Sequence, residues 1–144
     1  MADPLAGLRE MARVTREGGV VAACVWDHGG GGGPLSVFWQ AAREIDPRVE
    51  DESRRAGARE GHLGELFRET GLHDVREGAL SVSVAHASFE EWWEPFELGV
   101  GPAGGFTIGL DAKRRADLRE RCRGLLPAAP FAITAEAWVA RGLA

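Results

Sequence analysis

The sequence predicts an α/β fold with a mixed sheet of about three strands. The segment Val20–Trp26 is apolar at every position, which is typical of a strand covered on both faces in a parallel sheet. Two later segments, 72–84 and 131–140, alternate apolar and polar residues and predict further strands. Apolar residues at helical spacing lie between these segments. With 144 residues and 44% hydrophobic content, we expect one compact domain over residues 1–144.

The first part of the chain is expected to run helix, strand, loop, helix. Asp3 is a suitable N-cap and Pro4 suits a first helical turn, so a helix should begin there and end before Gly18. After the apolar strand, the glycines of Gly29–Gly33 predict a mobile loop. Pro34 then begins a helix that stops at Asp46 and Pro47.

The second part is expected to contain two strands separated by a helical insertion over residues 88–127. A short helix ending at Gly71 precedes the alternating segment 72–84, in which Gly78 suggests a bulge or a kink. Ser88 and Glu91 form a capping box, and Pro95 should kink or end the helix that follows. A loop is expected over Gly99–Gly109. Asp111 then caps a charged amphipathic helix before the last strand.

Composition excludes several classes of protein. Seventeen basic against twenty-two acidic side chains give a formal charge of −5, which argues against nucleic-acid and membrane partners. No apolar stretch approaches the ~20 residues of a membrane span, and no secretory signal precedes the first helix. We expect a cytoplasmic protein with two reduced thiols, Cys24 and Cys122, and the Arg-, Ala- and Gly-rich composition hints at a bacterial genome.

Two glycine-rich segments resemble phosphate-binding motifs only superficially. Gly99, Gly101 and Gly104 match G-x-G-x-x-G, but they follow a helical segment rather than a strand. Gly29–Gly33 lacks the Gly-Lys-Ser/Thr ending of a P-loop. The histidines show no ligand spacing with either cysteine, so no metal site is expected.

Two sequence blocks resemble class I S-adenosylmethionine-dependent methyltransferases. Leu8–Val21, LREMARVTREGGVV, is similar to the block L-x-E-h-x-R-V-h-x-P-G-G before the fifth strand of that family, with Glu17 in place of the proline. Leu63–Val75 resembles the later block L-x-x-L-F-x-x-A-G-F-x-x-V, with Thr70 and Leu72 replacing the alanine and the aromatic residue. The blocks occur in the family's order and at roughly its spacing.

The resemblance implies a three-layer, partial Rossmann-like fold that comprises the C-terminal half of a methyltransferase. In that family a glycine-rich turn and an acidic ribose ligand bind S-adenosylmethionine, and neither precedes Asp3. We therefore expect S-adenosylmethionine as the cofactor of the full-length family and no cofactor binding by this chain alone. Met1 is then expected to be an internal methionine of a longer gene.

Three residues at the end of the apolar strand are the first candidate site. Ligands of open α/β sheets collect at the carboxyl ends of strands, where Trp26, Asp27 and His28 lie. His28 suits a general base in methyl transfer, although an ordinary loop histidine is the alternative.

A second candidate site is an aromatic substrate wall. Trp92, Trp93 and Phe96 are expected to cover a small organic substrate, with Phe38 and Trp39 as the facing wall, or else to pack in the core. Since helical spacing does not direct two adjacent residues inward, one of the two adjacent tryptophans, Trp92 or Trp93, should be partly exposed or face a pocket.

The function expected from the sequence is methyl transfer to a small molecule, with this chain inactive alone. The alternative is a non-catalytic ligand-binding or interaction domain. In either case, an open sheet edge at Val20–Trp26 predicts a homodimer or pairing with a separate cofactor-binding chain.

Overall fold

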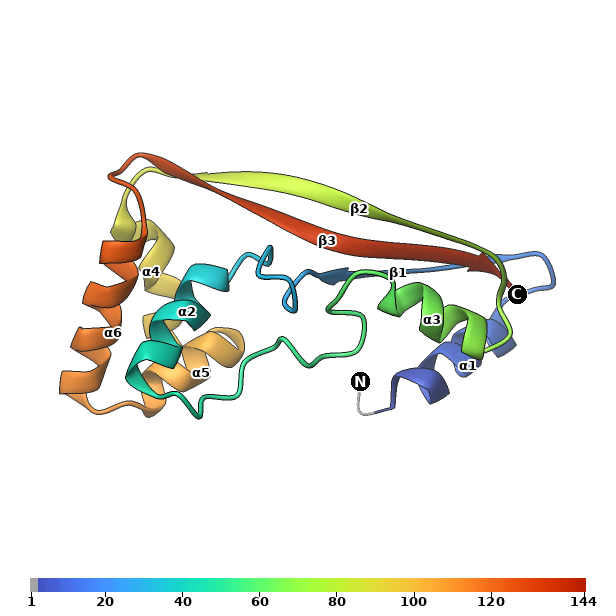
Figure 1. Cartoon of the computed structure of the whole chain (residues 1–144), viewed down its shortest axis with the longest axis horizontal. Helices are drawn as coiled ribbons and strands as arrows, with labels where there is room; N and C mark the ends of the chain where they lie inside the picture. Colours follow the sequence, from blue (N-terminus) through green and yellow to red (C-terminus); the bar gives the residue numbers. More distant parts are fainter. Residues whose placement is uncertain (1–2) are drawn as a thin grey trace. The chain divides into compact units, whose positions relative to one another are not determined.

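The computed structural model describes residues 3–144 and shows a mixed α/β protein (Figure 1). Along these residues the elements are α1 (Pro4–Val14), β1 (Val20–Trp26), α2 (Ser36–Ile45), α3 (His62–Glu69), β2 (His73–His86), α4 (Phe89–Glu97), α5 (Gly101–Gly109), α6 (Ala112–Leu125) and β3 (Phe131–Leu143). They form two compact units. Unit 1 comprises the chain up to Gly33, Glu52–Val82 and Ala135–Ala144, and unit 2 comprises Pro34–Asp51 and Ser83–Thr134.

The sheet has three strands, as predicted, but it is antiparallel rather than mixed. Its order is β1-β3-β2, so β3 is central and β1 is an edge strand. β1 pairs with β3 from Val20 opposite Leu143 to Trp26 opposite Ala137. The apolar run of β1 therefore has no parallel neighbour in the described residues. An uninterrupted apolar run does not by itself establish the direction of the neighbouring strand.

In unit 1, α1 and α3 pack on the same face of the sheet (Figure 1). Val21 of β1 and Ala140 of β3 are buried there with residues of these helices, including Leu8, Leu63 and Phe67. On β1 the residues that alternate with Val21 are exposed, namely Val20, Ala22, Cys24 and Trp26. The expectation that this strand is covered on both faces was wrong. Unit 1 has two layers, one of helices and one of sheet.

In unit 2, four helices surround an aromatic core. α2 packs against α6, and α4 packs against α5. The expected loop over Gly99–Gly109 was wrong, because the structure places α5 there. Pro102 stands in the first turn of α5, and Gly104 lies against the backbone of Gly99 so closely that a Cβ would collide with it. Gly104 therefore serves close packing between the start of α5 and the end of α4.

The expected helix caps are confirmed. The side chains of Asp3, Ser88 and Asp111 accept hydrogen bonds from the amides of Ala6, Glu91 and Arg114, at 2.9, 3.1 and 2.8 Å. Gly78, the expected position of a bulge or a kink, lies within β2, which continues as one strand from His73 to His86.

Candidate functional site

The loop after β1 is organised around the buried carboxylate of Asp27, whose exposed fraction is 5%. This carboxylate accepts hydrogen bonds from the amides of Gly30 and Gly32, at 2.8 and 3.1 Å. It also accepts one from the indole Nε1 of Trp138 on β3, at 3.0 Å. Asp27 therefore joins the end of β1, the glycine segment and the central strand of the sheet.

The glycines of this loop are required by close approach, so the expectation that they only supply flexibility was wrong. A Cβ on Gly30 would lie 2.5 Å from Oδ2 of Asp27, and one on Gly32 would lie 2.8 Å from it. The amide of Glu136 donates to the carbonyl of Gly32 at 2.8 Å, and the amide of Gly29 donates to the carbonyl of Ala58 at 2.8 Å. The loop is thus fastened to β3 and to the segment before α3.

The amides of Gly30 and Gly32 are also the groups that would hold an external anion. The carboxylate of Asp27 already accepts hydrogen bonds from both amides, so it occupies the position that an external anion would take.

The two residues on either side of Asp27 lie in different surroundings. Trp26 is 38% exposed at the end of the sheet edge. His28 is half-buried, and its Nδ1 would lie 3.1 Å from a Cβ on Gly33, which places the imidazole against the end of the glycine loop. A role of His28 as a general base stays a prediction.

The predicted aromatic wall forms the core of unit 2. The ring centroids of Phe38 and Phe96 are 4.6 Å apart, and those of Trp92 and Phe96 are 4.9 Å apart. Phe38 and Trp39 meet edge to face at 5.1 Å. These contacts bring all five predicted residues together: Phe38, Trp39, Trp92, Trp93 and Phe96.

Both adjacent tryptophans are buried, so the expectation that one of them is partly exposed was wrong. The exposed fractions of Trp92 and Trp93 are 5% and 1%. α4 is enclosed within unit 2 over more than a single stripe, because α5 packs along it and the Phe89 ring lies against both indoles, at 5.8 and 6.0 Å. The five rings have a packing role in this structure, and their use as a substrate wall stays a prediction.

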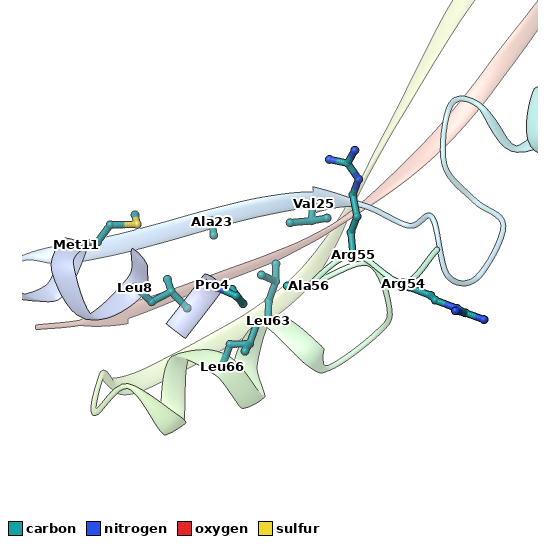
Figure 2. A pocket seen from close by; sticks show the side chains of 10 residues that line it. All are labelled: Pro4, Leu8, Met11, Ala23, Val25, Arg54, Arg55, Ala56, Leu63 and Leu66. Atoms are coloured by element: carbon teal, nitrogen blue, oxygen red, sulfur yellow. The ribbon is translucent and has the colours of Figure 1, made fainter. Parts of the chain in front are cut away.

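A groove of about 850 Å³ lies between α1, α3 and the inner face of β1 (Figure 2). Its walls are mainly apolar, with side chains from four separate segments: Pro4, Leu8, Met11, Ala23, Val25, Arg54, Arg55, Ala56, Leu63 and Leu66. Figure 2 shows the side chain of Arg54 pointing away from the leucines, while Arg55 is paired with the buried Glu52 at 3.2 Å. The groove offers an apolar surface without an acid, a base or a nucleophile.

Sequence reasoning did not find this groove. Leu8 and Leu63 were recognisable as parts of helical stripes, but the gap between the two helices depends on how they pack on β1. No local pattern encodes that spacing.

Comparisons with known proteins give no family for this chain. No protein-family model and no curated protein matches it. In residues 3–144, no helix has both the length and the apolar character needed to cross a membrane.

Proposed function

We propose that this chain is the C-terminal portion of an S-adenosylmethionine-dependent methyltransferase that acts on a small molecule, and that it requires a cofactor-binding half to be active. The observation that carries the proposal is the position of β1. A wholly apolar strand normally lies inside a sheet that is covered on both faces. β1 instead lies at an edge with one face exposed, which is what a sheet lacking its other half would show.

The two methyltransferase-like blocks also support the proposal through the structure they adopt. The first block forms most of α1, the turn at Gly18 and the beginning of β1, and the second forms α3, the turn at Gly71 and the beginning of β2. Gly18 and Gly71 have φ values of +68° and +84°, a backbone conformation that residues with a side chain rarely adopt. Both blocks thus occupy helix-turn-strand units, as a repeated α/β layer requires.

The contribution of this chain would be to hold and orient the methyl acceptor. Methyl transfer depends strongly on alignment of the two reactants, so a rigid loop at a strand end can contribute without a catalytic triad. Asp27 makes the loop after β1 rigid, and His28 is the residue of that loop that could accept a proton from the acceptor. In this proposal the cofactor-binding half supplies the site for S-adenosylmethionine, and this chain supplies part of the acceptor site.

Calorimetry tests this proposal. The chain alone and the chain together with the polypeptide encoded directly upstream would each be titrated with S-adenosylmethionine. We expect no binding heat from the chain alone and saturable binding from the longer protein. Micromolar binding by the isolated chain, or no binding by the longer protein, would overturn the proposal.

The free edge of β1 favours a second candidate function, a non-catalytic interaction domain that self-associates. An edge strand presents unpaired amides and carbonyls that can pair with another strand. Light scattering at micromolar concentration tests it: a dimer is expected if β1 pairs with its copy, whereas a monomer contradicts self-association through this edge.

A further inference from the structure

The face of the sheet opposite α1 and α3 is apolar and open. The exposed fractions of Val20 on β1 and of Leu80 and Val82 on β2 are 56%, 59% and 45%. On β2 these apolar residues alternate with small or polar ones, such as Ser81. A strand with this alternation directs its apolar side toward a partner surface. Within the described residues of unit 1, no helix covers the apolar side of β2, so the alternation indicates that a partner outside unit 1 covers it.

The middle of this open face is a trough of about 490 Å³ with a floor of small residues. Ala22, Cys24 and Gly78 line it together with Val139 of the central strand. The nearest atom to a Cβ placed on Gly78 would be Cγ2 of Val139, at 3.7 Å, so nothing crowds this position. An apolar strip with small residues along its middle, running along the strands, suits the side of an α-helix laid on the sheet.

The charged residues around the trough indicate the charge that a bound helix would carry. Arg76 and Arg141 line it, and neither forms an ion pair with any residue in the described range 3–144. Glu77 is also among the residues around the trough, but its carboxylate is bound by Arg68 at 2.7 Å and by the amide of Gly64 at 3.1 Å, both on α3 at the opposite face of the sheet. The trough is therefore locally basic in a chain whose formal charge is −5.

We propose that this sheet face is a docking surface for an amphipathic α-helix with an apolar stripe and acidic flanks. Its apolar stripe would cover the small residues of the floor, and its carboxylates would pair with Arg76 and Arg141. A second copy of the chain is the other occupant of this face that the test distinguishes. The proposal depends on the sheet face alone and holds whether or not the chain takes part in methyl transfer.

Cys24 makes the docking surface measurable, because its thiol lies in the floor of the trough and is exposed. Cys122 is the other cysteine. It is buried, and burial raises its pKa to about 12, so at pH 8 it does not compete for a thiol reagent. The rate of Cys24 modification in the full chain therefore reports whether the trough is covered.

The test uses three synthetic helical peptides of the same length. The first has a stripe of leucine and alanine with glutamates on the remaining positions, the second has lysines in place of the glutamates, and the third is a scramble of the first. We expect the glutamate peptide at saturation to slow Cys24 modification about tenfold, the factor expected when about nine-tenths of the chain is bound. The other two should change the rate by less than about twofold. Because the whole chain is acidic, non-specific attraction would favour the lysine peptide, so a preference for glutamate reports the local arginines.

Two variants complete the test, and both change exposed residues only. The double variant Arg76→Glu with Arg141→Glu should transfer protection from the glutamate peptide to the lysine peptide. Leu80→Ser should weaken protection by the glutamate peptide, while circular dichroism shows an unchanged fold. Equal protection by both charged peptides, or protection by neither, overturns the proposal. Protection that rises with protein concentration in the absence of peptide also overturns it, because a second copy then occupies the face.

Discussion

Replacing Asp27 with alanine should destabilise the chain through the loss of three hydrogen bonds. The buried carboxylate accepts from Gly30, Gly32 and Trp138 at 2.8, 3.1 and 3.0 Å. A hydrogen bond to a charged group contributes about 1.5–3 kcal/mol, and three bonds to one carboxylate are not additive. We therefore expect Asp27→Ala to lower the free energy of unfolding by about 3 kcal/mol.

Urea denaturation followed by circular dichroism measures this loss. With a slope of about 2 kcal/mol per molar urea, a loss of about 3 kcal/mol moves the midpoint down by about 1.5 M. Asp27→Asn keeps one accepting oxygen and should give an intermediate midpoint. Asp117→Ala is the matched control, because it removes an exposed helix pair with Lys113 at 2.8 Å and should cost about 0.5 kcal/mol or less. If Asp27→Ala and Asp117→Ala share one midpoint, the carboxylate does not organise the loop.

Four further predictions concern the glycine loop, the two thiols and the aromatic core. In the same urea assay, Gly30→Ala should destabilise the chain, because the added Cβ would lie 2.5 Å from Oδ2 of Asp27. Gly105→Ala is the control: nothing lies within 4 Å of its Cβ, so it should be neutral or stabilising by up to about 1 kcal/mol. Mass spectrometry at pH 8 should show one modified thiol per folded chain, at Cys24. Burial raises the pKa of Cys122 to about 12, so the buried thiol's contribution to stability is full below about pH 9 and falls as the pH rises toward 12. The urea midpoints at pH 8 and pH 10 should therefore differ less in Cys122→Ala than in the parent chain. Trp92→Ala should cost about 3–5 kcal/mol, as for a core residue, while a loss below about 1 kcal/mol would indicate a lid residue instead.

The parts of the fold that local chemistry determines were predictable from the sequence. The bounds of β1 follow from the apolar run between Gly19 and Asp27, and they are the bounds of Val20–Trp26 in the structure. The caps at Ser88 and Asp111 were also recognisable, because a side-chain oxygen three residues before a free amide is a local signal.

The parts that depend on tertiary contacts were not predictable. The glycines after β1 predict only a mobile loop, because the carboxylate of Asp27 approaches them closely only in the folded structure. α5 was read as a loop, since its glycine content lowers helix propensity and only packing against α4 compensates for that. Burial of both Trp92 and Trp93 required two sides of α4 to be covered, which a single helical stripe does not reveal.

The candidate site divides in the same way. Trp26, Asp27 and His28 were identified because the end of a strand is a position that the sequence defines. The sequence does not predict that the carboxylate of Asp27 holds the loop together. That role depends on hydrogen bonds from two amides and from the indole of Trp138, 111 residues away.

The central claim, that this chain works with a cofactor-binding half, is tested most directly by the DNA sequence upstream of the Met1 codon. The account predicts an open frame that continues through a strand, a glycine-rich turn and an acidic residue about 20 positions further on. A stop codon close upstream, or an open frame without the glycine-rich turn and the acidic residue, would contradict it.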